Sequence, residues 1–194
     1  MPPAHEGAVF LITDDHWLQP ARHCPSPNHN ERPPGTAVSL VVVHGISLPP
    51  GEFGGPYIDD LFCNRLDASV HPYFVTLAGL EVSSHLLIRR DGELVQYVPF
   101  DRRAWHAGRS HYAGRDNCND FSVGIELEGT DDMPYAEAQY RQLAAVIAVL
   151  EARYPACRGA CVGHSDIAPG RKTDPGPAFD WQYLQHLLHR EERS

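Results

Sequence analysis

The chain has 194 residues, 42% of them hydrophobic and 21% charged, and its formal net charge is −9 at pH 7. This length and composition suit one soluble domain with its own core, and they exclude a disordered or fibrous chain. The negative charge, without a stripe of Lys or Arg, argues against nucleic acid as a partner. No segment approaches the roughly 20 apolar residues of a membrane span.

The start of the chain is rich in Pro, Asn, His and Arg, as in RHCPSPNHNERPPG. This composition predicts an irregular arm over residues 1–37, packed on residues 38–194 within one structural unit. The apolar run at residues 8–12 is too short for a signal peptide, and Asp14 and Asp15 follow it. We therefore expect a cytoplasmic protein.

The first strong strand pattern is the β-branched run SLVVVH at residues 39–44. A continuous run of this kind predicts a strand buried on both faces, which ends at His44 before a Pro- and Gly-rich loop. The apolar spacing of residues 56–62 then suits a short helix. Two β-rich runs within residues 82–99 flank Asp91-Gly92, which is the strongest short-range signal for a hairpin.

A second strand is predicted at residues 121–128, FSVGIELE, where apolar and other residues alternate. Alternation places Val123, Ile125 and Leu127 on one face of the strand. The opposite face carries Gly124, Glu126 and Glu128. One face therefore packs in the core, and the other presents carboxylates.

The C-terminal part of the chain alternates between helical and irregular patterns. Apolar residues at three- and four-residue spacing predict a helix over residues 135–154, and residues 161–164 suit a short strand. Pro and Gly residues in HSDIAPGRKTDPG, residues 164–176, predict a loop rather than a helix. A last helix is expected to begin near Asp180, which is an acceptable N-cap residue.

Among the twelve histidines, His44 and His164 stand where a predicted strand leaves for a loop. With Asp174 they offer two imidazoles and one carboxylate, a set that suits one zinc ion with a fourth position open for water. Three unrelated surface residues are the alternative, because no short motif joins them. His85 and His106 stand at no such exit and are assigned no role.

A zinc site of this kind predicts a hydrolase. Zinc lowers the pKa of bound water from about 16 towards about 7 and polarises a nearby carbonyl. A carboxylate must then carry a proton to the leaving amine, and Glu126 is the candidate, although Glu128 shares its face and periodicity does not choose between them. In an extended Lys172-Thr173-Asp174, the lysine projects to the same side as Asp174 and would face the developing oxyanion.

The five cysteines have no paired C-x-x-C spacing. Free thiols in a reducing compartment are the expected state. Cys157 and Cys161 stand near each other in sequence, but no cysteine is assigned a function.

Four segments together resemble the AmpD-type 1,6-anhydro-N-acetylmuramyl-L-alanine amidases of the amidase_2 superfamily, which also contains peptidoglycan recognition proteins. The segments are HGISLPPGEFGG, SSHLLIRRDGELVQYVPFDRRAWHAG, CNDFSVGIELEGTD and GHSDIAPGRKTDPGPAFDW. The resemblance implies an α/β (mixed α+β) single domain with a central mixed β-sheet flanked by helices, and a zinc site in a surface cleft.

The resemblance also implies the reaction. The family hydrolyses the amide between the lactyl group of anhydro-N-acetylmuramic acid and L-alanine, in cytoplasmic recycling of cell-wall fragments, which keeps down the muropeptides that induce a β-lactamase. Its one zinc ion corresponds to His44, His164 and Asp174. Its catalytic glutamate corresponds to Glu126 and its catalytic lysine to Lys172, so the choice between the two glutamates follows from the resemblance.

Three positions depart from the family pattern, which puts fine substrate preference in doubt. Gly45 stands where the family commonly has Asn, and Glu81 and Asn117 stand where some relatives carry Arg near the substrate. Trp105 is retained, either as a stacking surface for the sugar ring of the substrate or as a core residue.

Two other functions stay open. The alternatives to the amidase are an exported hydrolase of intact peptidoglycan and a muropeptide-binding module without activity. The five matched residues favour an enzyme over a binding module, and the lack of an export signal and of wall-binding repeats favours the cytoplasmic amidase. We expect a monomer whose partner is an anhydromuramyl peptide, with neither nucleic acid nor membrane as a partner.

Overall fold

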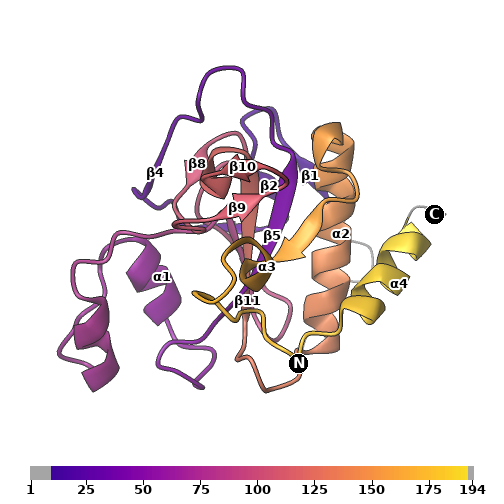
Figure 1. Ribbon diagram of the computed structural model, residues 1–194. Coiled ribbons are helices and arrows are strands. Elements are labelled where there is room, and N and C mark those ends of the chain that lie inside the picture. Colours follow the sequence, from indigo (N-terminus) through magenta and orange to yellow (C-terminus); the bar gives the residue numbers. More distant parts are fainter. Residues whose placement is uncertain (1–9, 192–194) are drawn as a thin grey trace.

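The computed structural model describes residues 10–191, so residues 1–9 of the predicted arm, including His5, and residues 192–194 lie outside the described residues. Its centre is a six-stranded sheet (Figure 1). The strands, in sheet order, are β12 (Cys161–Gly163), β5 (Leu40–Ile46), β11 (Ser122–Glu128), β6 (Leu86–Ile88), β7 (Leu94–Gln96) and β3 (Arg22–His23).

The sheet is mixed. Strands β12, β5, β11 and β6 run parallel to one another, whereas β7 runs antiparallel to β6 and β3 runs parallel to β7. The predicted single domain with a mixed sheet and flanking helices is confirmed. Because four neighbouring strands share one direction, their carboxyl ends meet at one edge, where α/β sheets place their sites.

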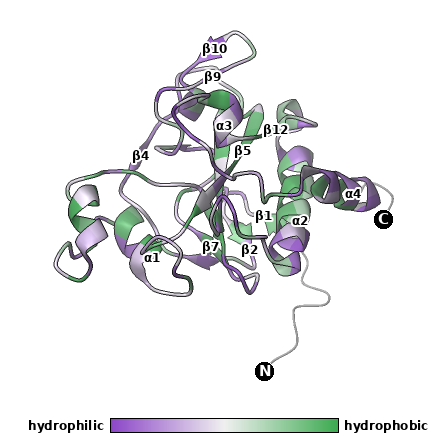
Figure 2. Ribbon diagram, turned by 60° about the horizontal axis from the view of Figure 1, so that its bottom comes forward, coloured by the Kyte–Doolittle hydropathy of each residue, from purple (hydrophilic) through white to green (hydrophobic). Residues whose placement is uncertain are grey.

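Helices cover the sheet on both sides (Figure 1). The helices α2 (Glu137–Arg153) and α4 (Trp181–Glu191) pack together on one face, over the core that includes Val41, Val43 and Ile125. On the other face, α1 (Tyr57–Phe62) and the 3₁₀ helix η1 (Pro72–Leu77) belong to a second cluster, around Leu87 and Tyr97. Hydrophobic residues accordingly run along β5 and within α2 (Figure 2).

The predicted helix at residues 135–154 is confirmed, although α2 begins at Glu137. The apolar residues at that spacing are buried from Tyr140 to Leu150, and Tyr154 is half-buried. Gln139 holds the N-terminal turn. The Oε1 atom of Gln139 accepts from the backbone N–H of Ala136 at 3.0 Å, and its Nε2 atom donates to the carbonyls of Ile88 and Glu128, both at 3.0 Å. One buried amide therefore ties the start of α2 to the ends of β6 and β11.

The strand predicted to end at His44 continues to Ile46. Gly45 and Ile46 remain in register with Leu127 and Glu128 of β11, so the ladder extends past His44. β11 is buried along its whole length, including the face with the carboxylates. A strand with parallel neighbours on both sides lies inside the molecule, and its polar face borders a site rather than open solvent.

The hairpin and the last helix follow their local signals. β6 and β7 are antiparallel across Asp91-Gly92, where Gly92 has φ +91°, a conformation that favours glycine. At the start of α4, Asp180 accepts a hydrogen bond from the backbone N–H of Tyr183 at 2.9 Å, so it caps the helix as predicted.

The described part of the arm carries four strands of two residues each. β3 adds an edge to the central sheet, β1 (Leu11–Ile12) pairs with β2 (Leu18–Gln19), and β4 (His29–Asn30) pairs with β8 (Arg103–Ala104). The remaining elements are the pair β9 (His111–Tyr112) and β10 (Arg115–Asp116), the 3₁₀ helices η2 (Cys118–Asp120) and η3 (Pro155–Cys157), and α3 (His164–Ile167). None of the helices within residues 10–191 has both the length and the apolar character needed to cross a membrane.

Candidate active site

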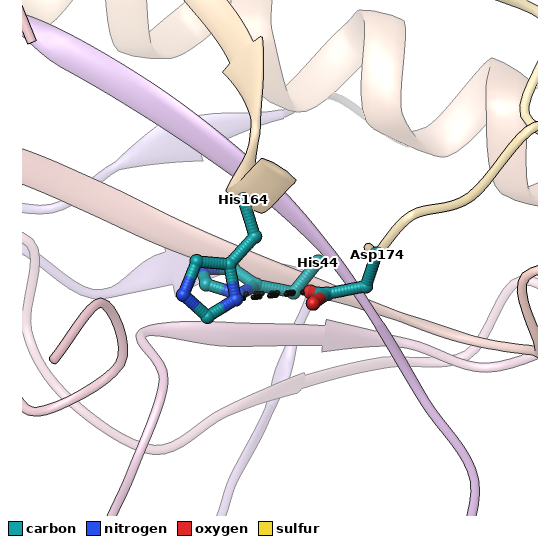
Figure 3. Close-up of side chains that lie close together, drawn as sticks. All are labelled: His44, His164 and Asp174. Atoms are coloured by element: carbon teal, nitrogen blue, oxygen red, sulfur yellow. Dashed lines mark hydrogen bonds and ion pairs between the residues drawn. The ribbon is translucent and has the colours of Figure 1, made fainter. Parts of the chain in front are cut away.

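Two histidines and an aspartate converge at the carboxyl edge of the parallel strands (Figure 3). His44 lies on β5, His164 directly follows the neighbouring strand β12, and Asp174 comes from the loop beyond. The Nδ1 atoms of His44 and His164 are 2.9 Å apart. The Oδ2 atom of Asp174 lies 3.1 Å from Nδ1 of His164 and 3.4 Å from Nδ1 of His44. The sequence alternative of three unrelated surface residues does not hold.

The segment that carries His164 and Asp174 differs from the predicted loop, because its first residues form the helical turn α3. The turn fits because Pro169 and Gly170 come only after Ile167, where they cannot break it. Asp166 caps the turn by accepting from the backbone N–H of Gly163 at 2.7 Å. This turn points the His164 ring back over the end of the sheet.

A backbone carbonyl sets the tautomer of His164. Its Nε2 atom lies 3.2 Å from the carbonyl oxygen of Ala107. A carbonyl only accepts, so Nε2 carries the proton and Nδ1 of the neutral ring keeps its lone pair. Arg171 donates to the same carbonyl at 2.6 Å and holds it in place.

A chain of three side chains sets the tautomer of His44. The hydroxyl of Ser122 donates to the carbonyl of Cys118 at 2.6 Å, so it accepts from Nε2 of His106, 3.0 Å away. The Nδ1 atom of His106 is then the acceptor for Nε2 of His44, at 2.8 Å. Nδ1 of His44 therefore also keeps its lone pair.

Two imidazole lone pairs and a carboxylate thus face one another with no proton between the rings. Burial, against the opposing effect of the Asp174 carboxylate, lowers the pKa of His44 to about 4. Three electron-pair donors, two nitrogen and one oxygen, fit a divalent cation such as zinc at their common point.

His106, which the sequence analysis assigned no role, is the residue that sequence reasoning missed. Its ring packs directly on Gly124 of β11, where an added Cβ would lie 2.5 Å from the ring. The signal was present in FSVGIELE, because Gly124 is the one position on the carboxylate face without a side chain. A glycine in a buried strand often marks a close approach of another group.

The three donors open onto a cavity of about 570 Å³ that Glu126, Trp105 and Lys172 also line. Glu126 is 8% exposed, and its Oε2 atom is buried without a hydrogen-bond partner. Burial raises the pKa of Glu126 well above its usual value, Asp174 raises it further, and Lys172 opposes the shift. A carboxyl group with a raised pKa and a free oxygen is suited to proton transfer.

Glu128 has the opposite environment. Its Oε1 atom accepts from the backbone N–H of Gly54 at 2.7 Å and from Arg89 at 3.2 Å, and its Oε2 atom accepts from the N–H of Arg90 at 3.3 Å. Glu128 does not line the cavity. Its carboxylate is therefore engaged in holding the ends of two strands and a loop together.

The remaining positions from the sequence analysis divide between cavity and surface. Trp105 lines the cavity, half-buried, and its indole N–H donates to Oδ1 of Asn30 at 3.0 Å. Gly45 also lines it, and a Cβ there would lie 2.4 Å from the Tyr135 hydroxyl, so a side chain at this position requires that hydroxyl to shift. The exposed residues Glu81 and Asn117 are not part of the cavity lining.

Comparison with known proteins identifies the family of the chain. The family model Amidase_2, described as N-acetylmuramoyl-L-alanine amidase, matches residues 34–177. The chain belongs to this family. It is 60% identical over 178 residues to the 1,6-anhydro-N-acetylmuramyl-L-alanine amidase AmpD of Citrobacter freundii, with 92% of this chain and 95% of the relative covered.

Solved structures of Amidase_2 relatives have the same fold. A crystal structure of a selenomethionine AmpD derivative superposes with a TM-score of 0.90 at 60% identity, covering 92% of this chain and 99% of the other. AMPDH3 from Pseudomonas aeruginosa in complex with anhydromuramic pentapeptide superposes with a TM-score of 0.58 at 31% identity, covering 80% of this chain and 61% of the other.

Proposed function

We propose that this chain is a zinc-dependent N-acetylmuramoyl-L-alanine amidase that hydrolyses the lactyl–L-alanine amide of 1,6-anhydro-N-acetylmuramyl peptides. One observation carries the proposal: the Nδ1 atoms of His44 and His164 and the carboxylate of Asp174 converge at a cavity that also holds the unpaired carboxyl of Glu126. Identity of 60% with an AmpD amidase along nearly the whole chain supports the same substrate class.

The cavity is compatible with a substrate of this kind. Its volume, about 570 Å³, is within the range of small-molecule sites, and a relative binds an anhydromuramic pentapeptide. The lining combines an indole, Trp105, with apolar side chains from η1 and charged groups at the metal end. In this proposal the indole faces the sugar, and the charged groups lie at the scissile amide.

The proposed chemistry divides among the residues that line the cavity. When bound by His44, His164 and Asp174, zinc lowers the pKa of water and polarises a carbonyl. Glu126 takes a proton from the attacking water at its free Oε2 atom and passes it to the leaving amine of alanine. Lys172, exposed at the cavity wall, offers its ammonium group to the negative charge that grows on the carbonyl oxygen.

The test combines metal analysis with a product assay. Purified protein should contain one zinc ion per chain and should release free stem peptide from an anhydromuramyl peptide. A chelator should remove both, and added zinc should restore both. Bound substrate without released peptide would support the binding module. Faster cleavage of intact sacculi than of soluble fragments would support the exported hydrolase.

The cellular role belongs to the same proposal. We place the enzyme in the cytoplasm as a monomer that recycles cell-wall fragments, with an influence on β-lactamase induction, because it is similar to AmpD amidases. Deleting the gene should make anhydromuramyl peptides accumulate in the cytosolic fraction. If anhydromuramyl peptides accumulate outside the cytosol, or do not accumulate at all, the proposed cellular role is wrong. The proposed reaction is not affected by that result.

A further inference from the structure

Two cysteines outside the proposed active site lie against each other where the arm meets α1. The Sγ atoms of Cys24 and Cys63 are 3.6 Å apart, although the residues are 39 positions apart in the chain. Cys24 follows β3, and Cys63 is the C-cap residue of α1. Both are free thiols.

The backbone around the two sulfurs is fixed by hydrogen bonds between the same two segments. The side-chain amides of Asn28 and Asn64 bond reciprocally at 2.7 and 2.9 Å. The hydroxyl of Ser26 donates to the carbonyl of Phe62. A disulfide requires the sulfurs to approach to about 2.05 Å. From their separation of 3.6 Å, the sulfurs have to come closer by about 1.5 Å.

The two thiols differ in their surroundings. Cys24 is half-buried, and its sulfur raises the pKa of the adjacent Arg65 guanidinium through a side-chain hydrogen bond. A cationic neighbour and partial exposure are typical of reactive cysteines. Cys63 is only 9% exposed, and burial together with the hydrogen bond to Cys24 raises the pKa of its thiol to about 11. Cys24 is thus the thiol that a reagent reaches first, and Cys63 is the more shielded of the two.

We propose that Cys24 and Cys63 form a redox modification site, at which a peroxide converts the two thiols into a disulfide linking the N-terminal arm to α1. The Cys24 sulfur attacks one peroxide oxygen, the O–O bond breaks, and Cys24 sulfenic acid and one water result. The Cys63 thiol then gives up its proton as its sulfur attacks the sulfenic sulfur. The S–O bond breaks, and the leaving hydroxyl departs with that proton as a second water. Two thiols are oxidised by two electrons, and one peroxide is reduced to two waters.

The disulfide would act on the wall of the proposed substrate cavity. Leu61 and Phe62, which line that cavity, immediately precede Cys63 on α1. The link would therefore fasten this wall to the arm covalently. The inference rests on the thiol geometry alone and stands whether or not the proposed amidase activity is found.

The experiment treats the native, zinc-loaded protein with hydrogen peroxide, blocks remaining thiols with N-ethylmaleimide, and maps disulfides by mass spectrometry. A protease specific for glutamate separates the cysteines, because Glu31 and Glu52 lie between them. We expect a linked peptide with Cys24 and Cys63 as the main disulfide, and its loss on treatment with dithiothreitol. The proposal is overturned if other cysteines are oxidised while Cys24 and Cys63 are both recovered in alkylated form. It is also overturned if the link forms only in urea.

Variants test the order of the two steps. In Cys63→Ser, Cys24 should be trapped as a sulfenic acid by dimedone, whereas Cys63 in Cys24→Ser should stay unlabelled. Cys118→Ser is the matched control, because this buried thiol contacts neither sulfur of the pair, and its link yield should equal that of the wild type. If Cys63→Ser does not fold, Cys24→Ser at the half-buried position must still abolish the link. Equal dimedone labelling in both variants contradicts the assigned order.

Discussion

Glu126 and Glu128 stand two residues apart on β11 and face the same side of the sheet, yet only Glu126 borders the cavity. The alternation of FSVGIELE placed both on one face and could not separate them. The separation comes from partners: a buried oxygen of Glu126 has none, whereas Glu128 binds Arg89 and the N–H groups of Gly54 and Arg90. A single residue's role therefore depends on what the rest of the chain brings to it.

Replacing each glutamate by glutamine should produce opposite results. In Glu126→Gln, turnover should fall by about 10²-fold or more while zinc stays bound, because the variant loses a proton carrier but keeps all three proposed metal ligands. In Glu128→Gln, the unfolding free energy should fall by about 3 kcal/mol, because the buried ion pair with Arg89 is broken. Steady-state kinetics, metal analysis and denaturant unfolding of both variants provide the measurement. Wild-type turnover in Glu126→Gln would assign the proton transfer elsewhere.

Lys172 should matter for rate and not for stability. Its side chain is exposed at the cavity, so Lys172→Ala should change the unfolding free energy by no more than about 0.5 kcal/mol. Turnover should fall by about 10²-fold, as on loss of an oxyanion donor. Lys172→Arg is the matched variant, because it keeps the charge. A kcat equal to that of the wild type in Lys172→Ala rules out the oxyanion role.

At the scale of elements, the segment between β8 and β9 contacts the rings of both His44 and His164. Two consecutive residues of this segment provide the acceptors, since the ring of His106 accepts from His44 and the carbonyl of Ala107 accepts from His164. The glycine at position 124 of β11 provides the space for the His106 ring. The orientation of the two rings, one on β5 and one directly after β12, is thereby set by one loop.

This arrangement predicts non-additive effects at two positions. His106→Ala should weaken zinc binding about 10- to 100-fold, because the His44 ring loses its acceptor. Gly124→Ala should weaken it similarly, because its Cβ displaces the His106 ring. The double variant should bind zinc no more weakly than His106→Ala, because the missing ring leaves room for the methyl group. Competition with a chromogenic chelator measures the three affinities, and strictly additive losses would contradict the contact.

At the scale of the whole molecule, buried neutral histidine makes stability depend on pH. The Nδ1 atom of His85 accepts from the backbone N–H of Gly124 at 3.0 Å, and its Nε2 atom donates to the carbonyl of Arg102 at 2.9 Å. Burial, with a contribution from Arg32, lowers the pKa of His85 from 6.5 to about 3. The folded protein therefore keeps this ring neutral at pH values where the unfolded chain protonates it.

The sign of the effect follows from proton binding. Below pH 6.5 the unfolded chain binds one more proton at His85 than the folded protein, so the unfolding free energy falls as the pH falls towards 3. Between pH 6.5 and 5 the loss at this site is about 2 kcal/mol. The glutamine in His85→Gln does not titrate, so between pH 6.5 and 5 the unfolding free energy of this variant should fall by about 2 kcal/mol less than that of the wild type. Urea unfolding with saturating zinc measures the difference. His186→Gln, on the exposed side of α4, is the control and should follow the wild type. Parallel curves for wild type and His85→Gln would contradict the prediction.

The sequence alone was sufficient wherever the controlling interactions are local. Apolar periodicity predicted α2, Asp91-Gly92 predicted the turn between β6 and β7, and Asp180 predicted the start of α4. These features depend on residues within a few positions of one another. Two predictions were wrong at element ends. One helical turn fits before Pro169, and β5 extends past His44 because its partner strand β11, which is distant in sequence, continues beside it.

The tertiary structure decided what depends on which strands are neighbours. The order β12-β5-β11 brings the donors of His44 and His164 together and sets Glu126 beside them, and packing across the sheet places His106 behind His44. The contact between the sulfurs of Cys24 and Cys63 likewise depends on where the arm crosses α1. Residue types along a chain specify which groups are able to bind a metal or react. Sheet order and packing determine which of those groups meet, because both involve contacts between positions far apart in sequence.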